Sequence, residues 1–180
     1  MTLVCTSIEE SSHLTPFQKN DLLGFRPQQS FSTTYGNFLV KTADTVAELF
    51  QLLELRHEIF IREGLESEHE EGLDYDRYDL LGDHILVLDK NTKQMVGTYR
   101  LLCSKFTSEF YSQNEFYLDE FLARPGVKLE LGRAGVHRDY RDGVSLNLVW
   151  LGLARYARLV SADFMFGCAS VKTDCPLTAL

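Results

Sequence analysis

The stretch LELGRAGVHRDYRDGVSLN, residues 129–147, joins a strand pattern, a turn and the start of a helix. Apolar residues on both sides of Glu130 predict a strand over residues 128–136, and SLNLVWLGLARYARLV predicts an amphipathic helix over residues 145–160. The N-terminus of a helix after such a turn binds anions, because its first backbone N–H groups have no partner within the helix. The stretch therefore predicts an anion site. The length of its turn bears on whether the anion is a single phosphate or a diphosphate.

Strands and helices alternate through the rest of the chain. Thr45 can cap a helix that runs to Phe60 with its apolar residues largely on one face. HILVLD and QMVGTYRLLC are joined by NTK and predict a hairpin. The other predicted elements are a strand at 37–42, a polar loop at 63–82, one or two short helices within 106–124, and a buried strand at 164–170. This order predicts an α/β fold around a mixed sheet.

Length and composition limit the class of protein. The chain has 180 residues, of which 44% are hydrophobic, enough for one domain with a real core. Residues 1–35 have little periodicity and predict a flexible leader, so residues 36–180 are expected to form a single domain. No apolar run reaches the length of a membrane span, and the N-terminus is too polar for a signal peptide. The four cysteines have no CxxC spacing and are interpreted as reduced thiols, so we expect a cytoplasmic protein.

The charge is unevenly distributed. The net charge of −8 argues against nucleic acid as a partner. Residues 54–89 carry twelve acidic residues and three arginines, whereas residues 133–158 carry five arginines and two aspartates. The two halves therefore suggest two differently charged ligands or surfaces, and the alternative is two solvated faces. No HExxH motif occurs, and the acidic segment lacks the glycine of an EF-hand loop, so no metal site is predicted.

Three charged residues lie within otherwise apolar strand patterns: Arg100, Glu130 and Arg133. A charge inside such a strand needs a partner or a ligand, because burial of an unpaired charge is costly. Glu130 and Arg133 are three positions apart, so they lie on opposite faces of a regular strand. A bulge at Gly132 would bring them towards one side and turn a backbone N–H group outward as an oxyanion donor. The alternative for each residue is an ion pair.

The order of these elements, together with GTYRLL, LELGRAGVHRDYR and FGCAS, resembles the Gcn5-related N-acyltransferase (GNAT) superfamily. Within it, the chain is most similar to the ornithine N-acyltransferases that begin ornithine-lipid synthesis, which are often mislabelled as hemolysins. It is more distantly similar to acyl-homoserine-lactone and N-acyl amino acid synthases. The resemblance covers about residues 37–172. It implies a mixed, mostly antiparallel central sheet flanked by helices, and we expect this domain to be truncated at its C-terminus, without the superfamily's last strands.

The resemblance also implies roles for particular residues. The match to GTYRLL and ELGR implies that Arg100, Glu130 and Arg133 surround the catalytic centre. The match to LRHEIF and DYDRYD implies that the acceptor side of the site is formed by Arg56, Phe60, Asp76 and Asp79, with Asp74 beside them. Such an acidic cluster suits a cationic amino acid such as ornithine. The alternative, compatible with the first, is that Asp76 and Asp79 cap the loop or tether it to an arginine.

The turn indicates the acyl donor. Members of the superfamily that bind acetyl-CoA carry R/Q-x-x-G-x-G/A here, whereas this chain has a turn one residue shorter, in which Asp142 would repel a diphosphate. Ser145 is a good N-cap, and the helix still suits a single phosphate. The predicted phosphopantetheine-binding residues are Arg141, Gly143 and Ser145. We therefore expect no tightly bound cofactor, and we expect the phosphopantetheine arm of an acidic acyl carrier protein, rather than CoA, to be the donor.

These inferences predict transfer of a 3-hydroxy fatty acyl group from acyl carrier protein to the amino group of ornithine, which gives lyso-ornithine lipid at the inner face of the membrane. Glu130 is the predicted base, directly or through a water. Trp150 is expected to line an acyl tunnel with Leu146, Leu153 and Phe166, although the three helical positions also fit plain core. Cys168 is interpreted as a buried structural cysteine. The alternatives are an acyl-homoserine-lactone or other N-acyl amino acid synthase, and a catalytically silent module that binds a carrier protein or a lipid.

Overall fold

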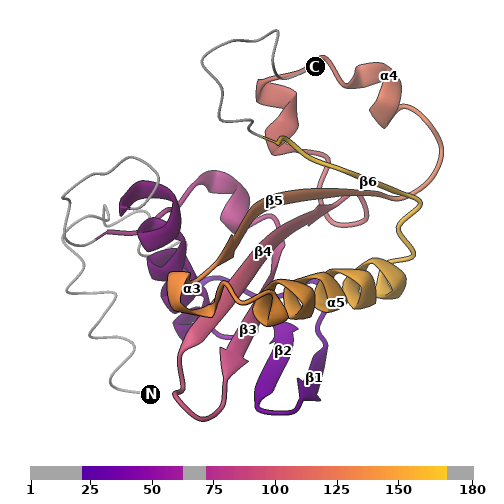
Figure 1. The fold of residues 1–180 in the computed structure, drawn as a ribbon. Coiled ribbons are helices and arrows are strands. Elements are labelled where there is room, and N and C mark those ends of the chain that lie inside the picture. The colour runs from indigo at the N-terminus through magenta and orange to yellow at the C-terminus, as the bar shows by residue number, and fades with distance from the viewer. Residues whose placement is uncertain (1–21, 63–71, 170–180) are drawn as a thin grey trace, which may run out of the picture.

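Six strands form one sheet in the order in which they follow along the chain (Figure 1). Neighbours from β1 to β5 are antiparallel, and β6 is parallel to β5. The strands are β1 (Ser32–Tyr35), β2 (Phe38–Thr42), β3 (Asp83–Asp89), β4 (Met95–Cys103), β5 (Lys128–Val136) and β6 (Phe164–Phe166). The computed structural model describes residues 22–62 and 72–169. Within them, the mixed and mostly antiparallel sheet that the sequence predicted is confirmed.

Two long helices pack on this sheet. They are α3 (Val46–His57), which continues into the π-helical turn η1 (Glu58–Arg62), and α5 (Val144–Leu159). Thr45 caps α3, because its side chain accepts a hydrogen bond from the Glu48 N–H at 3.2 Å. The shorter helical turns are η2 (Arg77–Asp79), η3 (Tyr111–Asn114), α4 (Asp119–Leu122) and η4 (Arg138–Tyr140). The predicted helices before residue 60, within 106–124 and over 145–160 are thus all present.

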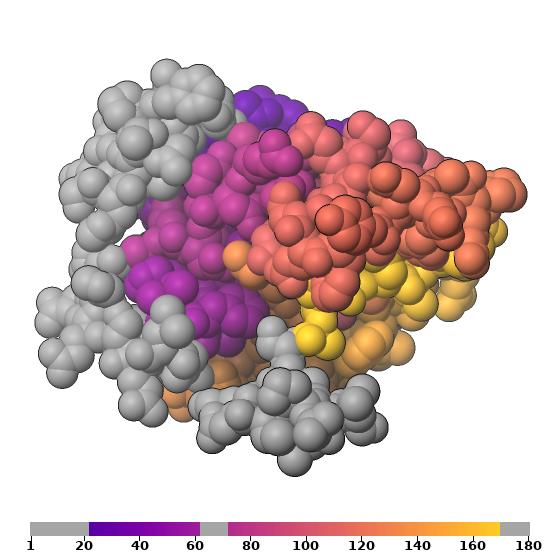
Figure 2. Space-filling model, turned by 90° about the horizontal axis from the view of Figure 1, so that it is seen from above, coloured from indigo at the N-terminus to yellow at the C-terminus, as the bar shows by residue number. Residues whose placement is uncertain are grey.

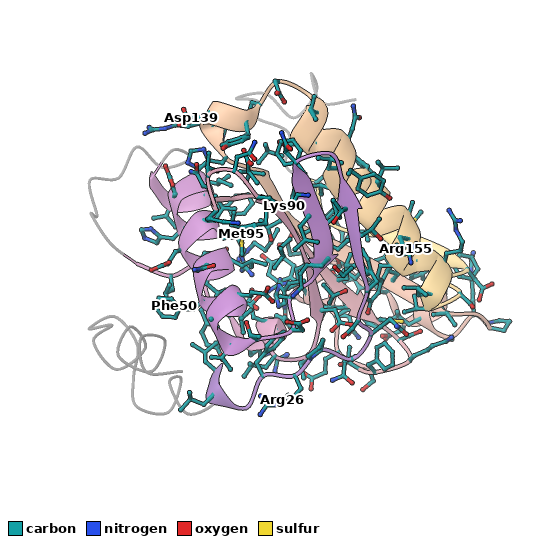
Figure 3. All side chains as sticks on the ribbon, turned by 90° about the horizontal axis from the view of Figure 1, so that it is seen from below. Arg26, Phe50, Lys90, Met95, Asp139 and Arg155 are labelled. Carbon is teal, nitrogen blue, oxygen red and sulfur yellow. The ribbon has the colours of Figure 1, made fainter. Side chains whose placement is uncertain are left out.

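Each long helix covers one face of the sheet. Figure 3 shows α3, which carries Phe50, on one side of the strands and α5, which carries Arg155, on the other. On the α5 side, Leu148, Val149 and Leu153 pack on apolar residues of β2 to β5. The other side has a separate core, in which leucines of α3 pack on Met95 and Leu86. The alternation along each strand therefore supplies two cores.

Part of the expected leader belongs to the domain. Leu22, Phe25 and Phe31 are buried, and β1 forms the outer strand of the sheet beside β2. Asp83 fixes this segment, because its carboxylate accepts hydrogen bonds from the backbone N–H groups of Gln28 and Gln29 at 2.7 and 2.9 Å. The prediction of a flexible leader is wrong for residues 22–35, since the fixing contact comes from a residue more than fifty positions away. The rest of the leader, residues 63–71 of the predicted loop and the chain after 169 lie outside the described residues.

The last two strands separate soon after they meet. β6 pairs only with Lys128–Glu130, so the remainder of β5 has no strand beside it on that edge within the described part of the chain. Gly167 directly follows β6 and is still close to β5, because a Cβ atom there would collide with the Leu131 carbonyl oxygen. The prediction of a buried strand over 164–170 is therefore wrong in length and in burial, since β6 is short and Met165 is 57% exposed.

The connection between β4 and β5, which contains η3 and α4, packs against β6. In Figure 2 the segment that contains η3 and α4 lies beside the yellow residues of β6. The contact is aromatic, because the Phe166 ring lies 5.4 Å from Phe110 and 5.0 Å from Phe121, measured between centroids.

Among the described residues, no helix is long and apolar enough to span a membrane.

Candidate active site

A bulge in β5 lies beside the open edge. Between the pairs Thr98–Gly135 and Arg100–Gly132, β4 advances two residues and β5 advances three, so β5 contains one additional residue. Arg133 takes up this difference with a left-handed backbone, φ 53°. The bulge predicted at Gly132 is thus present, but its left-handed residue is Arg133. It brings Arg133 to the side of the sheet that Glu130 faces, and both residues line one polar pocket.

Asp79 lies at the centre of a buried group of ion pairs. Its Oδ1 is 2.6 Å from Arg56 Nη1 and 3.0 Å from Arg100 Nη1. Burial alone would raise the pKa of Asp79, but the two guanidinium groups outweigh it and lower the pKa to about 2. Arg56 and Asp79 are completely buried, so they position the loop before β3 and do not reach the site surface.

Asp74 and Asp76 extend this group to the bulge. Asp74 Oδ2 is 2.8 Å from Arg56 Nε and 3.0 Å from Arg133 Nε. Asp76 Oδ1 is 2.6 Å from Arg100 Nη1 and also accepts the Tyr78 N–H at the start of η2. We call these three aspartates and three arginines the ion-pair network; its members are Arg56, Asp74, Asp76, Asp79, Arg100 and Arg133. The cap-and-tether alternative for Asp76 and Asp79 is what the contacts show.

Glu130 is anchored by the turn that starts η3. Its Oε2 accepts the Tyr111 N–H and its Oε1 the Ser112 N–H, each at 2.7 Å, and the Ser112 hydroxyl also donates to Oε1. Glu130 is 3% exposed, and Oε2, with one bond, keeps an acceptor site for the pocket. Sequence reasoning missed Ser112, because a serine in a short helix carries no sign of a carboxylate partner eighteen residues away.

The polar pocket beside Glu130 has a volume of about 160 Å³. Its charged lining residues are Arg100, Glu115, Glu130 and Arg133, and its other walls include Tyr111, Phe116 and Cys168. Cys168 follows the end of β6 and is half-buried, and its thiol donates to the Ser112 hydroxyl at 3.2 Å. The interpretation of Cys168 as a residue within a buried strand is therefore wrong.

Phe60 and Trp150 take different positions. The Arg133 guanidinium lies 6.0 Å from the centre of the Phe60 ring, which places Phe60 at the bulge. Trp150 is 51% exposed and packs edge-to-face on Tyr99, with the ring centres 6.2 Å apart. It lines a second, mainly apolar cleft of about 330 Å³ between α5 and β5. The other residues of this cleft are Tyr99, Ala134, Gly135, Val136, Arg141, Gly143, Leu146 and Val149. Leu153 is core instead, and Phe166 packs on Phe110 and Phe121.

The turn before α5 borders this apolar cleft. Gly143 is the N-cap of α5, with a left-handed φ of 88° that glycine adopts without strain. Ser145 therefore lies inside the first turn and is completely buried, so the prediction that it caps the helix is wrong. Asp142 Oδ1 instead accepts the Val144 N–H at 2.9 Å, and Arg141 Nε donates to the Val136 carbonyl at 3.1 Å. Arg141 and Gly143 line the cleft, whereas Ser145 does not.

The two cavities meet along consecutive residues of β5. Gly132 and Arg133 line the polar pocket, and Ala134 and Gly135 line the apolar cleft. A small polar molecule and a long apolar one can therefore approach the same bulge from two sides. In the parts of the chain that the structure describes, no group of three His, Cys, Asp or Glu side chains is arranged to hold a metal ion.

Two cavities that meet at one strand can hold two molecules side by side, as transfer of a group between them requires. The chain belongs to the GNAT acetyltransferase family, because the model of the acetyltransferase (GNAT) domain matches residues 55–151. This confirms the superfamily that the sequence motifs resembled.

Curated relatives are named L-ornithine N(alpha)-acyltransferase. The protein from Brucella abortus (strain 2308) is 38% identical over 78% of this chain and 55% of its own length, and that from Rhizobium meliloti (strain 1021) is 36% identical over 74% and 50%. The chain thus spans about half the length of these relatives. A solved structure of a probable acetyltransferase is 16% identical, with a TM-score of 0.47, over 77% of this chain and 83% of that one.

Proposed function

We propose that this chain transfers a 3-hydroxy fatty acyl group from acyl carrier protein to the α-amino group of ornithine, which gives lyso-ornithine lipid. The observation that carries the proposal is the meeting of a polar pocket and an apolar cleft at the bulge of β5. Acyl transfer to an amine needs this arrangement, because a thioester carbonyl and an amine must be held in contact. The names of the curated relatives support ornithine as the acceptor.

The donor occupies the apolar cleft. Its acyl thioester lies along residues 134–136 of β5, where Tyr99, Leu146 and Trp150 offer apolar surface. Its phosphate lies at the start of α5, close to Arg141. Asp142 already accepts one backbone N–H of this helix start and places a negative charge in the turn. That favours a single phosphate, as on a phosphopantetheine arm, over the diphosphate of CoA.

The acyl carrier protein docks on the arginines around this turn. Arg138, Arg141, Arg155 and Arg158 lie in or beside α5, and carrier proteins are acidic. The charge of this segment is opposite to that of the partner, although the whole chain carries a net charge of −8. The proposal therefore places the carrier protein at the α5 face and the amino acid at the opposite side of the bulge.

Catalysis follows from the groups at the bulge. Backbone N–H groups of Gly132 and Arg133 stabilise the oxyanion that forms when the amine attacks the thioester carbonyl. Glu130 takes the proton of the amine through the remaining acceptor site of Oε2, directly or through a water. The Arg133 side chain, 30% exposed and held by Asp74, faces the carboxylate of the amino acid. As the C–N bond forms, the oxyanion collapses and the C–S bond breaks, so the phosphopantetheine thiol leaves with a proton and no covalent enzyme intermediate is required.

The experiment that tests the proposal is acyl transfer with ornithine, comparing 3-hydroxyacyl carrier protein with 3-hydroxyacyl-CoA and scoring the product by mass. Transfer from the carrier protein in clear excess over CoA is expected. Equal rates from both donors would overturn the argument from the turn and keep the reaction class. Absence of N-acylornithine with either donor would contradict the proposed function of this chain.

A further inference from the structure

The carboxylates around the polar pocket differ in whether an arginine balances their negative charge. Each aspartate of the ion-pair network contacts two of its arginines, so three negative charges meet three positive ones. Glu130 accepts three hydrogen bonds from Tyr111 and Ser112. Glu115 also lines the pocket, and it adds a further negative charge that no arginine of the network balances. The network, Glu115 and Glu130 together therefore carry an excess of two negative charges.

Glu115 directly follows η3, is exposed, and lines this pocket. Its carboxylate accepts a hydrogen bond from the Tyr111 hydroxyl, and this bond is the main cause of a raised Tyr111 pKa. Phe116, which is 56% exposed, lines the same pocket. A pocket lined by a carboxylate and by aromatic rings suits an ammonium group, because it can combine an ion pair with cation–π attraction.

The pocket also offers a positive group, because Arg133 lines it together with Glu115. The Arg133 guanidinium lies 5.6 Å from the centre of the Tyr111 ring, and Arg133 contacts the same Tyr111 hydroxyl that donates to Glu115. An amino acid whose carboxylate binds Arg133 can therefore bring the ammonium of a short side chain to Glu115, the other partner of the Tyr111 hydroxyl. The pocket volume of about 160 Å³ lies well below the 300–1,000 Å³ of a drug-sized ligand site, which suits a single amino acid.

We propose that Glu115 determines the acceptor specificity of this enzyme by binding the side-chain ammonium of a dibasic amino acid, with Tyr111 and Phe116 beside it. This inference rests on the proposed function, because it assigns the polar pocket to the acceptor. It accounts for a requirement of Nα-acylation: when the α-amine reacts, the side-chain ammonium keeps its charge and needs a partner. Glu115 is thus a binding residue, and Glu130 remains the group near the reacting atoms.

The test compares ornithine with norvaline, which has the same carbon chain without the ammonium group. Binding of each amino acid is measured by calorimetry for the unmodified chain, Glu115→Gln and a matched control, Glu120→Gln. Glu120 is an exposed residue of α4 that does not line the pocket, so its substitution changes the net charge equally. We expect ornithine to bind about tenfold more tightly than norvaline in the unmodified chain and in Glu120→Gln, and about equally in Glu115→Gln.

Three outcomes would overturn the inference: no preference for ornithine in the unmodified chain, an unchanged preference in Glu115→Gln, or an equal loss in both variants. Acyl transfer measured on the same three proteins separates this inference from the proposed function. If ornithine binds with the expected preference but is never acylated, the proposed function fails and the ammonium site stands. If ornithine is acylated with an unchanged ornithine-to-norvaline ratio in Glu115→Gln, the site fails and the function stands.

Discussion

Replacement of Glu130 by glutamine separates a catalytic base from an anchor. Glutamine has nearly the same shape, but its amide offers one oxygen and one NH₂ group. Glu130 accepts a backbone N–H on each oxygen, from Tyr111 and from Ser112, so in either orientation of the amide one N–H would face an NH₂ group. One bond to a charged group is lost and one buried donor is left unpaired, which together cost about 3 kcal/mol of unfolding free energy. That is less than the total stability of an ordinary domain.

Ser112→Ala is the matched control for this change. It removes the hydroxyl that donates to Glu130 but leaves the carboxylate and both backbone N–H bonds in place. We expect it to cost about 1 kcal/mol of stability and less than tenfold in kcat. Glu130→Gln, if the carboxylate is the base, should lower kcat by at least 100-fold in protein that is still folded.

The assay is urea unfolding of both variants, followed by acyl transfer to ornithine at a temperature at which each is folded. The transfer rate of Glu130→Gln should recover as the pH is raised, because the acceptor amine then loses its proton without help from the enzyme. A kcat of Glu130→Gln within threefold of the unmodified chain would refute the assignment of the base. Glu130 would then be an anchor for the turn at Tyr111 and Ser112.

Three further predictions concern stability and the donor. Burial lowers the pKa of His84 to about 4. Between pH 6.5 and 4 the unfolded chain therefore binds a proton that the folded chain does not. The free energy of unfolding should fall by about 3 kcal/mol as the pH falls through this range. The low pKa of Asp79, held by its arginines against the effect of burial, adds a further loss only between pH 4 and 2. Urea unfolding from pH 7 to 4 measures the first step, and a flat profile would contradict it. Tyr156→Phe removes the hydrogen bond of 2.5 Å to the buried Asp83 carboxylate and should lower the free energy of unfolding by about 2 kcal/mol in the same assay. A loss below about 0.5 kcal/mol, the effect of an ordinary surface substitution, would count against that hydrogen bond. Trp150→Ala should raise the KM for long acyl donors more than for short ones, and equal effects on both would place the acyl chain elsewhere.

Much of the fold could be predicted because the signals are local. The alternating pattern of β5, the periodic pattern of α5 and the Thr45 cap each lie within a few residues, and all three elements formed as expected. The same local motifs were enough to indicate the family. The boundary of the leader was missed, because the residue that fixes it, Asp83, lies far along the chain.

The sequence predicted which residues form the candidate site better than it predicted what each of them does there. Arg100, Glu130 and Arg133 do lie together at one pocket, and Arg141 and Trp150 do line one cleft. The sequence offered no sign of Ser112, of the aromatic surroundings of Glu115, or of the exposure of Cys168. These depend on where the connection between β4 and β5 folds back, and composition does not encode that path.

The sequence by itself determined which segments become strands and helices, and which charged residues had to find partners inside an apolar sheet. Those properties follow from periodicity and from the cost of burying a charge, and both act on each residue in place. Only the tertiary structure decided which partners those charges found. It paired the ion-pair network, gave Arg133 the left-handed position in the bulge, and brought Tyr111 and Ser112 to Glu130. Contacts between residues far apart in the chain arise when the whole sheet closes, because only then do the carboxylates and guanidinium groups share one buried space.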